Sequence, residues 1–439
     1  MGGEDPGCEG GIKSVSTLLL MILAVAILIH VPLAFSLGLS VLLVLLISGD
    51  VSLLIIPQRI FAGVDSFSLL AIPFFLLSGN LMSASGITQR ILAFANAVVG
   101  RFPGGLAMTN IATNIFFGGI SGSAVADTAA IGSILMPAMI KEGYDKEFTV
   151  AVNANAAIVA PIIPPSILFI VYGVLTGQSI TRLFVAGAVP GVLIGLGFMV
   201  VAYFISKKRN YPRHPPASLR EVMITFKDSF FALFMPIFIL GGIISGVFTV
   251  TECSAMAVVY AMVIGLFVYR GLKPRDLIPV IKSTCHTTAV VMLIVSMAKL
   301  FSWVLVNNRL PEAVADLIMK TTSNPIIILL MINVALLIAG CFMEANAILV
   351  MFIPVLFPLT QMAGIDPIHF GVIACVNLCV GLVTPPVGLT LNLSCQMADC
   401  KLERGAKESL PFLAIGVAGL MIITYWSGLS MSLVKLLMP

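Results

Sequence analysis

The sequence predicts an all-α polytopic membrane protein made of two inverted repeats. Of its 439 residues, 59 % are hydrophobic and 10 % are charged, and the mean hydropathy is +1.10, which excludes an ordinary soluble domain. A shift of 221 residues aligns the second half with the first without a gap. The aligned pairs include Gly119 with Gly340, Ala124 with Ala345, Pro137 with Pro358, and Pro164-Pro165 with Pro385-Pro386. Glycine and proline breaks at matching positions of two apolar halves are typical of carrier proteins.

The first half, residues 1–206, begins with an acidic segment (MGGEDPGCEGG), so we expect its first apolar run to be a span and not a cleaved signal peptide. The expected elements are spans at 14–31, 33–49 and 65–86, an arm at 87–101, a re-entrant hairpin at 104–140, a broken span at 146–175 and a span at 182–206.

The segment 207–228 is predicted to be a cytoplasmic linker. It begins with the basic run KKRNYPRHPPASLR and contains Ser218-x-x-Glu221, the pattern of a capping box, which predicts a short amphipathic helix along the membrane surface. The second half, 229–439, is expected to repeat the order of elements, with spans at 229–248, 253–270 and 280–303, an arm at 308–322, a hairpin at 325–361, a broken span at 367–396 and a span at 410–436.

This topology gives about ten crossings, five in each half, so the second repeat is inverted relative to the first. Most of the 24 Lys and Arg residues then lie on the side of the linker, which makes that side cytoplasmic and both termini external. The eight cysteines lie mostly in apolar stretches and predict neither disulfides nor a metal site. A formal charge of +4 does not indicate nucleic-acid binding.

Oxygen-bearing side chains gather at the breaks. Ser121, Ser123 and Asp127 lie beside flexible glycines at the first hairpin tip, and Glu344 and Asn346 lie at the second. Such ligands suit a hard cation such as Na⁺, and an ionisable group at membrane depth is a functional candidate by default. The polar residues of the broken spans are further candidates, including Asn153, Asn155, Asn377, Thr384, Thr390 and Asn392.

Each candidate also has a structural explanation. Ser and Asn in spans often join helices, Asp127 could cap a half-helix, and Glu344 could lie in water. Asp145 and Asp366, a matched pair, are interpreted as loop caps. The run Gly119-Ile-Ser121-Gly122 has the form found around intramembrane protease nucleophiles, but we expect no enzyme, because the histidines are predicted near span ends, away from this tip.

Four runs carry a resemblance to a known family. The chain resembles the large membrane subunit of TRAP transporters, of the DctM or SiaM type, in GGISGSAVADTAAIGSILMPAMIKEGYDKEF (118–148), IPPS (163–166), GCFMEANAIL (340–349) and LVTPPVGLTLNL (382–393). The resemblance implies a sodium-driven importer of organic acids in a bacterial inner membrane. It also implies two partners, a small membrane subunit of the DctQ or SiaQ type and a periplasmic binding protein of the DctP or SiaP type. Overall similarity favours the sialic-acid branch.

The family resemblance further implies an elevator mechanism, in which hairpins and broken spans move against a static scaffold. Cation positions carried over by motif are Gly119, Ser121, Ser123 and Pro164 in the first half and Gly340, Asn346, Thr384 and Pro385 in the second. The implied substrate contacts are Ser123, Ser166 and Glu344; family members commonly have Asp at the last of these positions. A stand-alone sodium–carboxylate carrier and a membrane subunit that transports nothing are the alternatives.

Overall fold

The computed structural model describes residues 6–49 and 51–438, and in these ranges all regular structure is helical. The first half contains α1 (Pro6–Leu28), α2 (Leu33–Ser48), α3 (Ile55–Val64), η1 (Phe67–Leu70), α4 (Ala71–Ala84), α5 (Ile87–Val99), α6 (Gly105–Ser121), α7 (Ala124–Lys141), α8 (Lys146–Ala157), α9 (Ile167–Thr176) and α10 (Ile180–Lys208). The all-helical prediction is confirmed.

The second half repeats this order of helices. It contains α11 (Leu219–Ile244), α12 (Val250–Val263), η2 (Ile264–Val268), α13 (Pro274–Asn307), α14 (Leu310–Thr321), α15 (Pro325–Gly340), α16 (Ala345–Met362), α17 (Pro367–Gly381), α18 (Leu389–Ala398), α19 (Leu402–Tyr425) and α20 (Gly428–Leu437). The second arms of the two hairpins, α7 and α16, are both 18 residues long and begin 221 residues apart. The sequence repeat is therefore also a repeat of helix boundaries.

The repeat is broken where α13 is a single helix of 34 residues. Its counterpart in the first half is divided into α3, η1 and α4. The sequence analysis missed α3, which is only ten residues long and too short to give a span signal. The chain turns after α3 because Ser66 is extended.

Two further boundaries differ from prediction. The capping box at Ser218 and Glu221 is present, but it begins the single long helix α11, so there is no separate surface helix at 219–228. The last span, expected at 410–436, is divided into α19 and α20 at Trp426 and Ser427. In the described part of the chain, eight helices are long and apolar enough to cross a membrane, so the ten expected crossings stay a prediction.

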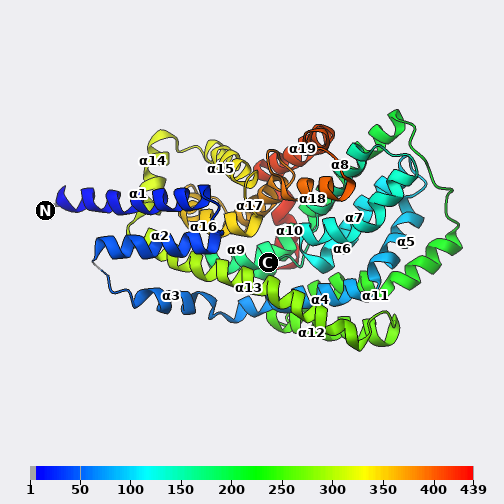
Figure 1. Ribbon diagram of the computed structural model, residues 1–439, viewed down its shortest axis with the longest axis horizontal. Coiled ribbons are helices and arrows are strands. Elements are labelled where there is room, and N and C mark those ends of the chain that lie inside the picture. Colours follow the sequence, from blue (N-terminus) through cyan, green and yellow to red (C-terminus); the bar gives the residue numbers. More distant parts are fainter. Residues whose placement is uncertain (1–5, 50, 439) are drawn as a thin grey trace.

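The helices form two packing groups that meet along the length of the molecule (Figure 1). In the outer group, α13 packs against α2, α3 and α4, while α4 packs against α12. In the inner group, α8 packs against α6, α7, α18 and α19, and α17 packs against α15, α16 and α19. Every residue of 148–157 in α8 and 368–381 in α17 is buried. These two helices are the centre of the inner group, as expected of helices that are apolar on all sides.

The segment between the two halves is anchored to the inner group. Arg209 donates two hydrogen bonds of 2.8 Å to the carboxylate of Glu408 and one of 3.0 Å to Asp145, which also accepts a hydrogen bond from Tyr211. The hydrogen bonds that Arg209 donates to Glu408 raise the pKa of Arg209, and burial raises the pKa of Tyr211. Asp366 caps α17 as predicted, whereas its counterpart Asp145 accepts from Arg209 and Tyr211 and makes no cap bond.

Candidate functional site

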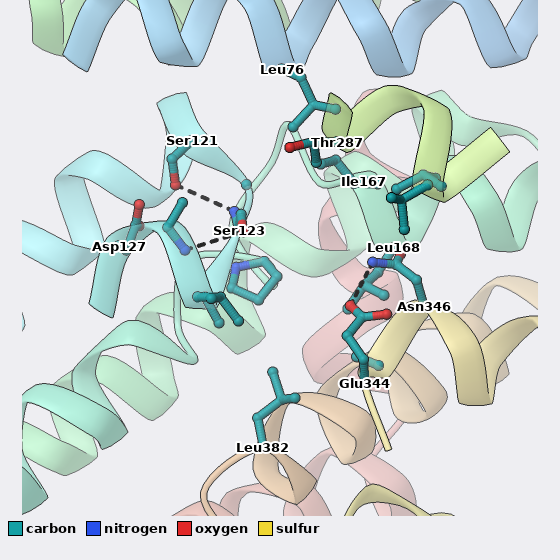
Figure 2. Close-up of a pocket in the computed structure, with 18 of the residues that line it drawn as sticks. Leu76, Ser121, Ser123, Asp127, Ile167, Leu168, Thr287, Glu344, Asn346 and Leu382 are labelled. Atoms are coloured by element: carbon teal, nitrogen blue, oxygen red, sulfur yellow. Dashed lines mark hydrogen bonds between the residues drawn. The ribbon is translucent and has the colours of Figure 1, made fainter. Parts of the chain in front are cut away.

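The first hairpin turns between α6 and α7. Gly122, with φ of 61°, ends α6 in the left-handed conformation that glycine adopts without strain. Ser123 then caps α7, because its Oγ accepts a hydrogen bond from Ala126 N at 3.4 Å, while its own N–H donates to Ser121 Oγ at 3.3 Å (Figure 2). Helix α7 therefore begins at the hairpin tip, where the positive end of its helix dipole lies.

The second hairpin turns at the matching place with different chemistry. Glu344, the counterpart of Ser123, caps α16 by accepting a hydrogen bond from Ala347 N at 3.2 Å. Its other oxygen accepts a hydrogen bond of 2.8 Å from the side-chain amide of Asn346 (Figure 2). The Glu344 side chain is thus bonded to its own helix end, which matches the favourable position for an acid at a helix N-terminus.

Each tip leaves a buried oxygen without a partner. Both carboxylate oxygens of Asp127, which is 0 % exposed, and Oδ1 of Asn346 have no hydrogen-bond partner among the described residues. An unpaired buried acceptor is costly, at about 1–3 kcal/mol and more when it is charged. Atoms of this kind are suitable ligands for a bound cation, and a carboxylate together with an amide oxygen is a donor set that hard cations prefer.

The hairpin tips pack tightly against the broken spans. A Cβ on Gly122 would lie 2.8 Å from the carbonyl oxygen of Pro165, and one on Gly340 would lie 2.8 Å from Cα of Gly381. Val387 N also donates to Cys341 O at 3.2 Å. Both breaks contain a cis Pro-Pro bond, at Pro164-Pro165 and Pro385-Pro386. Because these glycines have no side chain, the backbone of each hairpin tip comes into direct contact with the backbone of the broken span.

A cavity of about 930 Å³ lies between the two tips. The inner group contributes the first turns of α7, α9 and α16, including Ser123, Ile167 and Ala345. The outer group contributes residues of α4 and α13, and residues of α1 and α2 complete the wall. Three helix N-termini therefore end at one cavity, an arrangement that favours a negatively charged ligand.

The predicted site residues fall into two groups. Those that line the cavity are Ser121, Ser123, Asp127, Glu344 and Asn346. Those that lie at the breaks behind it are Gly119, Pro164, Ser166, Gly340, Thr384 and Pro385. Ser166 caps α9 and donates to Pro161 O, and Thr384 donates to Val380 O at 2.9 Å, so both hydroxyls are engaged within the broken spans.

The asparagines of the broken spans join helices. Asn153 Nδ2 donates to Thr128 O in α7 and to Ser394 Oγ in α18, and Asn155 Nδ2 donates to Ser409 Oγ in α19. In the second half, Asn377 Nδ2 donates to both oxygens of Asn333 in α15. These contacts hold the inner group together, which is the structural role considered for Ser and Asn in the sequence.

The sequence analysis missed the cavity wall that the outer group provides. Its polar residues are Asn80 and Ser83 on α4 and Ser283 and Thr287 on α13. Their spacings of three and four residues put each pair on one helix face, which was the available signal. The signal was not sufficient, because nothing in the sequence indicates that these faces meet the hairpin tips.

The sequence also matches a family of known transport proteins. Residues 20–429 match the family model described as "Tripartite ATP-independent periplasmic transporter, DctM component". The chain belongs to this family. It is thus the large permease of a TRAP transporter, as its motifs predict, and this agrees with the apolar helices of a multi-pass membrane protein.

Relatives within the TRAP family carry different substrates. The chain is 40 % identical to the sialic acid TRAP transporter large permease SiaM of Vibrio cholerae, over 87 % of this chain and 90 % of that one. It is 39 % identical to the C4-dicarboxylate permease DctM of Pseudomonas aeruginosa, over 91 % and 93 %. The isethionate permease DctMQ of Oleidesulfovibrio alaskensis is 41 % identical over 92 % of this chain and 64 % of that protein.

Solved structures of other transporters share the fold of this TRAP permease. The YdaH transporter of Alcanivorax borkumensis superposes with a TM-score of 0.59 at 14 % identity, covering 96 % of this chain and 98 % of that one. MtrF of Neisseria gonorrhoeae superposes with a TM-score of 0.54 at 14 % identity, covering 85 % of this chain and 83 % of that one.

Ser121 is the residue that the protease-like run would make a nucleophile. Its hydroxyl accepts a hydrogen bond from Ser123 N, and among the described residues no histidine lines the cavity. The relatives are permease subunits, which agrees with the expectation of no enzyme.

Proposed function

We propose that this TRAP permease imports a carboxylate-bearing organic acid, sialic acid (N-acetylneuraminate) by preference, together with Na⁺. The observation that carries the proposal is the cavity between the hairpin tips, where three helix N-termini meet two acidic side chains. The helix ends attract the substrate carboxylate, while the acids attract the coupling cation. Ser123, at the tip of α7, is the proposed contact for the carboxylate.

Coupling to a cation follows from the charge of the cavity. Its described lining includes Asp127 and Glu344 but no Lys, Arg or His. An anionic substrate roughly 6 Å from one such carboxylate would be repelled by about 3 kcal/mol at an effective dielectric constant of about 20. A cation bound beside the acids removes this repulsion, so substrate and cation should bind together.

Two cation sites are proposed, one behind each tip. The first would use Gly119, Ser121, Ser123, Asp127 and the carbonyl of Pro164. The second would use oxygens of Gly340, Asn346, Thr384 and Pro385. The orphaned oxygens of Asp127 and Asn346 support one ligand at each site. The first site includes a carboxyl group, which can carry a full negative charge when a cation is bound, and the second has only neutral oxygens, so the first should bind Na⁺ more tightly.

The proposed transport step is an elevator movement. The cavity lies at the boundary between the inner and outer packing groups. A movement of the inner group along α4 and α13 would carry both hairpin tips, with their contents, past a fixed wall. The movable domain would comprise the two hairpins and broken spans, within the repeats 1–206 and 229–439, with the segment 207–218 before α11 as the link between them.

The proposed assembly needs two partners. A small membrane subunit would complete the scaffold in the inner membrane, and a periplasmic binding protein would deliver the acid. One relative, DctMQ, is longer than this chain, which leaves room there for a further subunit. Both termini would face the periplasm, as the distribution of basic residues predicts.

The test is uptake of radiolabelled N-acetylneuraminate into proteoliposomes that contain this chain and the small subunit. The proposal predicts uptake that requires both an inward Na⁺ gradient and the binding protein. Uptake without the binding protein would instead favour a stand-alone carrier. Uptake that is equally fast in K⁺ and Na⁺ would contradict cation coupling.

A further inference from the structure

The wall of the cavity formed by the outer group has polar and apolar ends. On α13, Ser283 and Thr287 are followed by Val290, Val291 and Ile294, all lining the cavity. At 1.5 Å per residue, this face changes from polar to apolar over roughly 16 Å. The wall can therefore distinguish the two ends of a ligand.

The polar end of this wall is shared by two helices. On α4, Asn80 and Ser83 line the cavity, and Asn80 Nδ2 donates to Thr284 Oγ1 of α13 at 2.8 Å. This bond brings the polar faces of the helices together and leaves the Asn80 carbonyl as an acceptor. Thr287 Oγ1 donates to Ser283 O at 3.2 Å, within its own helix, so its oxygen can still accept a hydrogen bond.

The polar wall belongs to helices other than those of the hairpin tips. In Figure 2, Thr287 and Leu76 lie above Glu344 and Leu382, so the wall is apart from the second tip, while Ser121 of the first tip is level with Thr287. The groups on this wall are neutral hydroxyls and an amide, which bond well to hydroxyl and amide groups of a ligand. They cannot balance a negative charge, because no basic side chain lines the described cavity.

We infer that Asn80, Ser83, Ser283 and Thr287 form a subsite for the uncharged polar end of a singly charged, hydroxylated acid. The inference rests on the proposed function, which takes the single carboxylate to the hairpin tips, and it adds the substrate class. A second carboxylate at this wall would meet only hydroxyls and an amide, because no Lys, Arg or His lines the described cavity. Its desolvation would not be offset by an opposite charge, so a diacid should bind more weakly.

The experiment is direct binding of radiolabelled acids to the purified complex of this chain and the small subunit, in NaCl and in choline chloride. The binding protein is left out, so its own specificity does not enter. N-acetylneuraminate and gluconate represent singly charged hydroxylated acids, and succinate represents four-carbon diacids. The wild type should bind the first two more tightly than succinate, in NaCl only.

Removal of the subsite hydroxyls should act on the hydroxylated ligands alone. Ser283→Ala and Thr287→Val should each weaken binding of N-acetylneuraminate about 3- to 10-fold, and Thr287→Ser should restore it. Succinate binding should be unchanged in these variants. Ser296→Ala is the matched control, because Ser296 is on the same helix, bonds to Leu293 O, and does not line the cavity.

Three results would overturn the inference, and the last of them is distinct from the first two. Tighter binding of succinate than of both hydroxylated acids in NaCl, or equal losses for all three ligands in Thr287→Val, would remove the subsite but leave a Na⁺-coupled permease. Binding of no acid in NaCl, with a complex that remains folded by thermal unfolding, would remove the proposed function and the subsite with it.

Discussion

The first hairpin, α6–α7, and the second, α15–α16, turn at matching points of the repeat and end in different surroundings. Residues 105–114 of α6 are all buried, and α6 packs against α4, α5, α8 and α10. Helix α15 packs mainly against α16 and α17, and its outer face is exposed, with Ile326 at 58 % and Ile338 at 59 %. The first arm of the first hairpin, α6, is thus enclosed by protein, whereas the first arm of the second hairpin, α15, lies at the edge.

The tips also differ in the oxygen that each leaves free. The first leaves the carboxylate of Asp127, and the second leaves the amide oxygen of Asn346, because Glu344 is bonded to its own helix end. The two residues are not counterparts in the repeat, since Asp127 aligns with Ile348. The repeat therefore preserves the backbone of the site, while each half has its own ligands.

The largest effect is expected at Asp127. Asp127→Asn keeps the size of the side chain but removes the carboxylate from the proposed first cation site, so the proposed Na⁺-driven uptake should fall roughly 100-fold, equivalent to about 3 kcal/mol. Proteoliposome uptake measures the change, with thermal unfolding as the control for folding. Uptake by Asp127→Asn within twofold of wild type would show that the carboxylate of Asp127 is not needed for transport, and the proposed difference between the tips would be wrong.

A smaller effect is expected at Glu344, whose role as a helix cap can be separated from its charge. Asp and Ser are both good caps, so Glu344→Asp and Glu344→Ser should keep most of the stability, whereas Glu344→Ala should lose about 1 kcal/mol. Thermal unfolding of the purified complex gives this order. If Glu344→Ser is as unstable as Glu344→Ala, the cap is not the structural role of this side chain.

Close packing of Gly340 should be important for stability at the second tip, although the outer face of α15 is exposed. In Gly340→Ala, the new Cβ meets the backbone of Gly381, so α15 and α17 must separate, at a cost of about 1–3 kcal/mol. Gly241→Ala on α11 is the matched control, because no atom lies within 4 Å of its Cβ. The melting temperature should fall for the first variant only; equal melting temperatures would refute the close packing.

The smallest effect is expected at Arg209, which follows α10 and bonds to Asp145 in the first half and to Glu408 in the second. Arg209→Gln removes the bonds to Glu408 and Asp145, and a partly exposed pair of this kind contributes about 1 kcal/mol or less. Because the pKa of Arg209 is raised in the folded protein, its contribution to stability would be lost only at a pH above the usual pKa of arginine. The contribution should therefore be constant from pH 5 to 9. Thermal unfolding across that range tests it, and a difference between wild type and Arg209→Gln that changes with pH would contradict the assignment.

The sequence predicted the parts of the fold that depend on local signals. The hairpin expected at 104–140 extends from Gly105 to Lys141, and the one expected at 325–361 extends from Pro325 to Met362, because glycines, prolines and caps mark their ends. Helix α3 and the division of the last span were missed, since both depend on packing of short segments against α13 and α10.

The candidate site could be predicted in part for the same reason. The tip residues are near in sequence to the breaks that expose them, so a motif is enough to find Ser123 or Glu344. The wall residues Asn80 and Thr287 are 207 residues apart in the sequence and meet the tips only through tertiary packing. Sequence reasoning also could not tell that Asp127 is unpaired while Glu344 is bonded.

The most direct test of this account is Na⁺ binding to the purified complex by titration calorimetry, in the wild type, Asp127→Asn and Asn346→Ala. The account predicts two classes of site in the wild type, with the tighter one lost in Asp127→Asn and the weaker one lost in Asn346→Ala. Wild-type binding in both variants would contradict the assignment of one cation to each hairpin tip.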